Sequence, residues 1–148
     1  MKKAIVTGAN GFVGSALVRE LLSHDYEVFA MDLAGHQENL PVDSCLQFIP
    51  LELAQMGELP DKLPEREYDV FFHLAWAGSA GPARADTALQ LQNAQWTVDA
   101  VRTAKELGCK RALCAGSIME HETRAAAYTQ GNRPGPGYIY GGGKLIAH

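Results

Sequence analysis

Two polar residues at helical spacing near the end of the chain could perform acid–base chemistry. Tyr140 and Lys144 lie four residues apart at the start of a segment that predicts a helix, so both side chains project from one face. A nearby ammonium group stabilises a phenolate, which makes Tyr140 a candidate acid or base at a hydroxyl or carbonyl group. Ser117 follows a predicted strand and offers a hydroxyl that could hydrogen-bond the reacting oxygen. These three residues form the candidate catalytic set.

A glycine-rich segment at residues 7–14, with the sequence TGANGFVG, lies between a predicted strand and a predicted helix. Gly8 permits a tight turn, Gly11 lets the backbone approach a pyrophosphate, and Gly14 lets the helix pack close to the strand. The N–H groups and the dipole at a helix start favour negative charge there. The segment therefore predicts a dinucleotide-binding turn, with an ordinary surface turn as the alternative.

Asp32 stands at the end of the second predicted strand and bears on which dinucleotide is bound. A carboxylate there can accept hydrogen bonds from the adenosine ribose hydroxyls and would repel a 2′-phosphate. Residues 33–36 contain no arginine to bind that phosphate. The sequence thus favours NAD over NADP, and the alternative is that Asp32 is a solvated turn residue.

Alternating apolar strands and amphipathic helices must position these groups. The pattern predicts strands over residues 4–7, 27–31, 46–50, 69–74 and 111–115, and helices over 12–23 and 84–107. Gly108 closes the long helix at a position that suits a left-handed residue. Such alternation predicts an α/β fold with a parallel sheet, in one domain spanning residues 1–148.

Composition excludes several classes of protein. The chain has 148 residues, 47% of them hydrophobic, with a formal net charge of −4, which argues against nucleic acid or a membrane surface as a partner. No segment predicts a signal peptide or a membrane span. Three scattered cysteines suit reduced thiols in a cytoplasmic protein, and five histidines without ligand spacing predict no metal site.

Taken together, these motifs resemble the extended short-chain dehydrogenase/reductase superfamily, in its NAD-dependent epimerase/dehydratase branch. Residues 7–14 match the TGxxGxxG fingerprint, Asp32 matches the ribose-binding acid, and residues 73–75 (HLA) are similar to an HLAA-type stretch beside the cofactor. Asn93 stands where the family often has a structural asparagine. Ser117, Tyr140 and Lys144 match the family's Ser, Tyr and Lys.

The resemblance implies a Rossmann-type doubly wound parallel sheet and hydride transfer between a nucleotide-linked sugar and NAD. Tyr140 would exchange the hydroxyl proton, Ser117 would orient the hydroxyl, and Lys144 would tune Tyr140 and hold the nicotinamide ribose. The implied cofactor-binding residues are Gly8, Asn10, Gly11, Phe12, Val13, Gly14, Asp32, Glu52, Leu53, Leu74, Ala75 and Lys144. The alternative is a non-catalytic dinucleotide-binding module of the same superfamily.

Several positions depart from the family pattern or invite a second interpretation. Glu52 replaces an aspartate that often meets the adenine, and residues 115–116 (AG) replace a serine pair. Glu120 and His121 are either substrate-specific groups or solvated loop residues. We expect His73 to be a packed or capping residue and expect core packing for Trp76 and Trp96. In the resembled family the long helix commonly forms a homodimer interface, and an exposed or interface face there would carry Gln90, Gln92 and Gln95.

The last part of the chain looks like an interrupted element. Residues 129–137 are too rich in glycine and proline for a regular element and predict a loop. Tyr140 to His148 begin a helix that stops after about two turns. This pattern, and family members that run on beyond such a helix to supply a sugar-nucleotide pocket, predict that the sequence is the front part of a longer protein.

Overall fold

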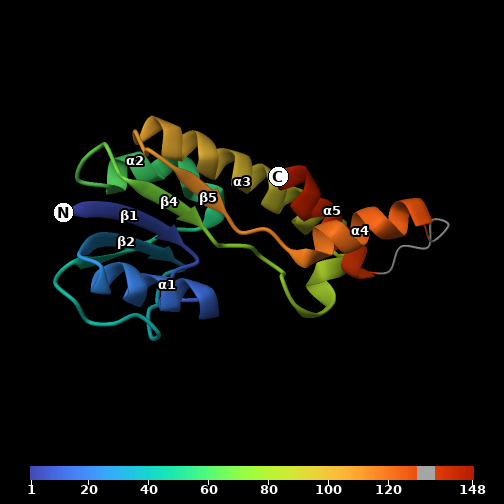
Figure 1. The fold of residues 1–148 in the computed structure, drawn as a ribbon, viewed down its shortest axis with the longest axis horizontal. Coiled ribbons are helices and arrows are strands. Elements are labelled where there is room, and N and C mark those ends of the chain that lie inside the picture. Colours follow the sequence, from blue (N-terminus) through green and yellow to red (C-terminus); the bar gives the residue numbers. More distant parts are fainter. Residues whose placement is uncertain (130–135) are drawn as a thin grey trace. The chain divides into compact units, whose positions relative to one another are not determined.

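A computed structural model describes residues 1–129 and 136–148 of the chain. The described residues divide into two compact units, the first comprising residues 1–75 and 99–115 and the second comprising residues 76–98 and 116–148. Figure 1 labels most of the helices and strands of both units.

The first unit is built around a five-stranded parallel sheet. Its strands are β1 (Lys2–Thr7), β2 (Tyr26–Asp32), β3 (Leu46–Pro50), β4 (Val70–His73) and β5 (Ala112–Cys114). They lie in the order β3-β2-β1-β4-β5, so the direction of strand progression reverses beside β1. Ligands of doubly wound sheets bind outside the carboxyl ends of the strands at such a reversal. The predicted α/β class and doubly wound parallel sheet are confirmed.

Alternate residues of each strand face two separate cores. On one face, Val6, Val28 and Ala30 pack with α1 (Phe12–Ser23), which follows β1 in Figure 1. On the other face, Ile5, Phe29 and Phe71 pack with η1 (Leu53–Glu58), α2 (Leu59–Lys62) and the last turns of α3 (Thr87–Glu106). Both faces of the sheet are covered, which is why its central strands read as continuous apolar runs.

Strand β5 is an edge strand with a different environment. It pairs with β4 through Phe71 opposite Ala112, and all three of its residues are exposed. Leu113 keeps 47% of its surface accessible. The sequence predicts this strand correctly from its apolar content, although that content is not explained by burial within the described residues.

The second unit contains helices and no strand among its described residues. It comprises the 3-10 turn η2 (Gly81–Ala85), the first turns of α3, α4 (Ile118–Thr129) and α5 (Pro136–Ala147). Helices α4 and α5 pack closely because Gly141 lacks a Cβ, which would overlap the Thr123 hydroxyl and the Met119 carbonyl. No described helix is long and apolar enough to cross a membrane.

Several elements differ from the sequence prediction. The sequence predicts no helix over residues 118–129, where Glu120 is either a substrate-specific group or a solvated loop residue, whereas the structure has α4 there, capped by Ser117 and Glu120. The long helix begins at residue 87 rather than 84, after the proline-containing turn η2. Of the predicted loop 129–137, residue 129 ends α4, residues 136–137 begin α5, and 130–135 lie outside the described residues.

Candidate functional site

The glycine loop of the first unit is held in a narrow turn directly after β1. Gly8 has a φ of +67°, a conformation that favours glycine, and a Cβ there would lie 2.8 Å from the backbone nitrogen of Ala75. The N–H of Gly11 donates to the Gly8 carbonyl at 3.2 Å, and Gly11 then accepts from the Ser15 N–H at the helix start. Both the turn and the close approach therefore require glycine at position 8.

The other two glycines of the loop, Gly14 and Gly11, have different structural roles. A Cβ on Gly14 would overlap the Gly8 carbonyl oxygen, so Gly14 is needed for α1 to pack against the turn. A Cβ on Gly11 would meet only the Gly8 oxygen at 3.3 Å within the described residues. Gly11 thus borders open space beside the first turn of α1, where backbone N–H groups have no intrahelical acceptor. This cradle fits a diphosphate.

Asp32 lies at the end of β2 and is bonded to the loop. Its Oδ2 accepts the backbone N–H of Asn10 at 2.8 Å, and its Oδ1 accepts the N–H of Leu33 at 2.9 Å. Each carboxylate oxygen has a second lone pair, so both can still accept a ribose hydroxyl. The structure therefore brings Asp32 and the glycine loop together, as the motif spacing predicts.

Asn10 connects the glycine loop to the segment after β2. Asn10 is 7% exposed, its Oδ1 accepts the N–H of Asn39 at 2.8 Å, and its carbonyl accepts the Asn39 amide at 3.0 Å. Arg19 donates to the carbonyls of Ser15 and Asn39. The pKa of the Glu38 carboxyl is lowered by a hydrogen bond to its own backbone and by the Asn10 side chain. No spacing pattern in the sequence marks Asn39 as part of this arrangement.

The end of β4 is joined to the end of β1 through the hydroxyl of Thr7. This oxygen accepts the N–H groups of Leu74 and Ala75, each at 3.2 Å, and lies 2.9 Å from Nδ1 of His73. Thr7 and His73 are 2% and 4% exposed. His73 is packed, which is one of the two roles predicted for it. Leu74 and Ala75 lie against Gly8, and their contact with a cofactor stays a prediction.

The remaining predicted cofactor residues of this unit have mixed environments. Glu52 is exposed at the end of β3 and begins η1, while Leu53 packs against the core. Phe12 and Val13 are 96% and 63% exposed. Phe12 and Val13 lie outside the buried face of α1, which is formed by Gly14, Ser15, Val18 and Leu21.

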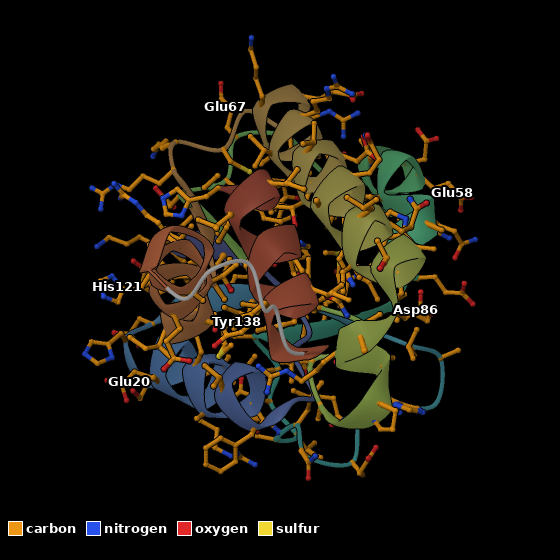
Figure 2. The ribbon with its side chains drawn as sticks, turned by 90° about the vertical axis from the view of Figure 1, so that its right-hand side faces the viewer. Glu20, Glu58, Glu67, Asp86, His121 and Tyr138 are labelled. Carbon is orange, nitrogen blue, oxygen red and sulfur yellow. The ribbon has the colours of Figure 1, made fainter. Side chains whose placement is uncertain are left out.

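Ser117 in the second unit caps helix α4. The Ser117 Oγ accepts the N–H of Met119 at 3.1 Å, while Oε1 of Glu120 accepts the N–H of Ser117 at 2.7 Å. The Glu120 bond is one arm of a capping box, whose S-x-x-E signature the sequence contains, while the Ser117 hydroxyl caps the N–H of the second helical residue. Glu120 also pairs with His148 at 3.0 Å. Glu120 is therefore neither a solvated loop residue nor a group shown to meet substrate, whereas His121 is exposed on α4 and projects outward in Figure 2.

Tyr140 and Lys144 on α5 share a contact with one indole. The Trp76 ring meets the Tyr140 ring edge-on with centroids 5.9 Å apart, and the Lys144 Nζ lies 3.7 Å from the Trp76 ring centroid. Arg84 from η2 places its Cζ 4.6 Å from the Tyr140 centroid. Lys144 is 6% exposed and Tyr140 is half-buried. The helical spacing therefore does place both side chains on one side of α5.

The structure of α3 shows that the prediction for Gln90 is wrong and that the prediction for Asn93 is correct. Gln92 and Gln95 are exposed as expected, but Gln90 is 1% exposed and bonded through its amide. Asn93 is also 1% exposed, and it exchanges two hydrogen bonds of 2.8 Å with the backbone of Ala77. Asn93 is structural, as predicted, whereas Trp76 and Trp96 are half-buried rather than core residues.

The described residues contain no group of three or more His, Cys, Asp and Glu side chains arranged to hold a metal ion. The predicted dinucleotide residues, apart from Lys144, belong to the first unit, and the predicted catalytic residues belong to the second.

The sequence of residues 4–148 matches the family model described as the NAD dependent epimerase/dehydratase family. The chain belongs to this family.

Solved structures with the same fold share little sequence with the chain. The UDP-Glc/GlcNAc 4-epimerase from Campylobacter jejuni superposes with a TM-score of 0.79 at 18% identity, covering 99% of this chain and 47% of that one. The Bordetella bronchiseptica enzyme WbmG in complex with NAD gives 0.74 at 20%, covering 98% and 48%. A putative short-chain dehydrogenase/reductase from Burkholderia multivorans with bound NADP gives 0.68 at 20%, covering 99% and 68%. The chain spans about half the length of the first two.

The first unit of this member of the NAD-dependent epimerase/dehydratase family contains the residues that the sequence predicts to bind a dinucleotide. The glycine loop is bonded to Asp32 through the carboxylate of that residue, and to the HLA stretch through the Thr7 hydroxyl and the close approach of Gly8 to Ala75. The structure therefore supports the family's cofactor fold with contacts of this chain's own residues.

Proposed function

We propose that the protein is an NAD-dependent epimerase, dehydratase or reductase that acts on a nucleotide-linked sugar by hydride transfer. The observation that carries this proposal is the cradle formed by Gly8, Gly11 and Gly14 with Asp32 bonded across it. Family membership over residues 4–148 supports the reaction class. NAD, when bound, would supply the acceptor or donor of the hydride.

The preference for NAD rests on the Asp32 carboxylate. It bears a negative charge at the end of β2, where an adenosine ribose lies in doubly wound folds. A 2′-phosphate placed there would be repelled, while two ribose hydroxyls would find acceptors. Structures with bound NAD and with bound NADP both share this fold, so the choice depends on such local groups.

In this proposal Tyr140 moves the proton of the reacting hydroxyl. Lys144 provides positive charge on the same side of α5, and that charge favours the phenolate form during proton transfer. Ser117 orients the reacting oxygen. Its Oγ accepts the Met119 N–H, and a hydroxyl that accepts one bond can still donate its hydrogen to a substrate oxygen.

A second candidate is a dinucleotide-binding module without catalysis. The observation that favours it is the capping box of α4, because that structural role alone would account for Ser117. In this reading Tyr140 and Lys144 pack on Trp76 without touching a substrate.

We also propose a homodimer formed through α3. Leu91 and Val98 on this helix are 50% and 38% exposed, and the neighbouring Gln95 is exposed as well. Sedimentation velocity of the chain and of a Val98→Glu variant would test this contact, since a charge at an apolar interface should dissociate the dimer.

Two measurements distinguish the enzyme from the module. Calorimetry with NADH tests the cradle in the 148-residue chain. Turnover of a panel of UDP-, GDP-, CDP- and dTDP-sugars, with the protein expressed from its complete reading frame, tests catalysis. We expect Tyr140→Phe to lower turnover about a hundredfold or more while NADH binding persists. Dinucleotide binding without turnover of any sugar would favour the module.

A further inference from the structure

The Tyr140 ring makes two contacts with side chains that lie outside its own helix. Trp76 meets it edge-on, and the guanidinium of Arg84 lies against it with Cζ 4.6 Å from the ring centroid. Both residues come from the segment between β4 and α3. We name Trp76, Arg84, Tyr140 and Lys144 the Tyr140 cluster.

Trp76 contacts both members of the candidate acid–base pair. The Lys144 Nζ lies 3.7 Å from the indole centroid, a short cation–π distance. The similar HLAA-type stretch has a small alanine at the corresponding place, whereas this chain has HLAW. The indole is therefore a feature of this chain rather than of the HLAA motif.

Gln90 fixes the position of this indole. Its Oε1 accepts the Trp76 Nε1–H at 2.8 Å, and its Nε2 donates to the carbonyls of Gly78 at 3.1 Å and Ala83 at 2.9 Å. Gln90 is 1% exposed, so these bonds form without competition from water. The Ala83 carbonyl immediately precedes Arg84. One buried amide thus holds the segments that carry both contacts of the Tyr140 ring.

Helix α5 also approaches Gln90 directly. A Cβ on Gly143 would lie 2.9 Å from the Gln90 carbonyl oxygen and 3.1 Å from its Cβ. Gly143 immediately precedes Lys144, so the turn that carries Lys144 packs on the residue that orients Trp76.

We propose that Gln90 and Trp76 are positioning residues that set the location of Lys144 and Tyr140. This inference rests on the proposed function of that pair and adds two residues to it. Gln90 acts through Trp76, and Trp76 acts through its ring face on Lys144 and its ring contact with Tyr140. A leucine at position 90 would remove the bonds that Gln90 makes to the Trp76 N–H and to the Gly78 and Ala83 carbonyls. The Ala83 carbonyl would keep the N–H of Asp86, but the indole and Gly78 would lose these partners, which would release the segment.

The test measures the reactivity of the Lys144 amine, which needs neither cofactor nor substrate. The 148-residue chain is pulsed with acetic anhydride at fixed pH, and acetylation of Lys144 is followed by peptide mass spectrometry with Lys105 as an internal exposed reference. The variants are Gln90→Leu, Gln90→Glu, Trp76→Leu and Trp76→Phe. Gln92→Leu, an exposed glutamine on the same helix, is the matched control. Trp76 emission in a Trp96→Phe background gives a spectroscopic signature.

We expect Gln90→Leu and Trp76→Leu to raise the Lys144 acetylation rate about tenfold, the change for loss of one cation–π contact. Trp76→Phe should restore most of the protection, because phenylalanine keeps an aromatic face. Gln90→Leu should shift Trp76 emission, and Gln92→Leu should change neither readout. If circular dichroism shows that Gln90→Leu does not fold, Gln90→Glu takes its place in the test. Glutamate keeps an acceptor for the Trp76 N–H but has no amide donors for the Gly78 and Ala83 carbonyls. The Lys144 acetylation rate of Gln90→Glu should therefore lie between those of wild type and Trp76→Leu.

Lys144 acetylation within about twofold of wild type in folded Trp76→Leu would overturn the inference, because a lost cation–π contact must exceed that. Equal rates in Trp76→Leu and Trp76→Phe would overturn it as well, since bulk rather than the aromatic face would then protect the amine. These outcomes are independent of the proposed function, which fails instead if NADH does not bind or if Tyr140→Phe remains fully active.

Discussion

The carboxylate of Asp32 accepts the backbone N–H of Asn10 at 2.8 Å, which ties the end of β2 to the glycine loop. One side chain therefore shapes the turn and also carries the charge proposed to discriminate between dinucleotides. Any substitution of Asp32 acts on both properties, and experiments must separate them.

We predict that the chain binds NADH at least about tenfold more tightly than NADPH, because the Asp32 charge opposes a 2′-phosphate. Asp32→Ala should narrow this ratio, and it should also weaken NADH binding because the bond to Asn10 is lost. Calorimetric titration of both dinucleotides measures the two effects. The exposed Asp61→Ala serves as a control, and a preference unchanged in Asp32→Ala would assign the discrimination to another residue.

Two glycines of the same loop should respond differently to a side chain. Gly11→Val should abolish dinucleotide binding with the fold retained, because its Cβ enters the open space proposed for the pyrophosphate. Gly14→Ala should lower the melting temperature, because its Cβ overlaps the Gly8 carbonyl. Circular dichroism and NADH titration of both variants give the comparison. Tight NADH binding by folded Gly11→Val would contradict the cradle.

Acid stability should depend on Asp69. Its carboxylate accepts the Lys110 ammonium at 2.6 Å and the Lys3 N–H at 2.9 Å, and the Lys110 bond lowers the pKa of Asp69. A carboxyl whose pKa is lowered by folding stabilises the protein above its unfolded value of about 3.9 and loses that contribution as the pH falls through the folded value. Asp69→Asn should therefore flatten the acid limb of the stability curve, measured by urea unfolding. The exposed Asp61→Asn should leave the limb steep.

Alkaline stability should depend on Tyr68. Its side chain is fully buried, and burial raises the pKa of its hydroxyl to about 12. The unfolded phenol ionises near 10, so the folded state loses stability as the pH rises from about 10 to 12. Tyr68→Phe should remove this part of the pH dependence in urea unfolding, and the partly exposed Tyr26→Phe is the control. An identical alkaline limb in Tyr68→Phe would refute the assignment.

The thiols should differ in reactivity. Burial raises the pKa of the Cys109 thiol to about 11, while Cys114 is exposed on the edge strand β5. Because the thiolate is the nucleophile, iodoacetamide at neutral pH should modify Cys114 about tenfold faster or more. Peptide mass spectrometry of a time course measures both rates. Comparable modification rates for the two thiols would mean that the segment from Cys109 into strand β5 opens readily.

Features that depend on residues close together in the chain could be predicted from the sequence. In the structure the three glycines form the turn after β1 and Asp32 is bonded to it. Tyr140 and Lys144 lie on one side of α5, as their four-residue interval predicts. The five strands follow from short apolar runs, with ends that differ by at most two residues.

What depends on contacts between distant residues could not be predicted. The sequence predicts Gln90 to be a surface residue because its amide is polar. Only the fold brings Trp76 and the Gly78 and Ala83 carbonyls to it. Helix α4 begins with the capping bonds of Ser117 and Glu120, and these polar residues also suit a solvated loop. The exposure of Phe12 also depends on how α1 packs against the sheet, although its apolar side chain favours burial.

The polar interior of α3 has a consequence for anyone who engineers this protein. Gln90, Asn93 and Thr97 form a polar stripe on the buried side of the helix, each at most 3% exposed. A thermostabilisation scheme that fills buried polar positions with leucine would choose these sites first. Leucine at position 90 or 93 would add apolar area but would remove the bonds that hold the backbone at Ala83 or Ala77, so these designs would be among the poorest.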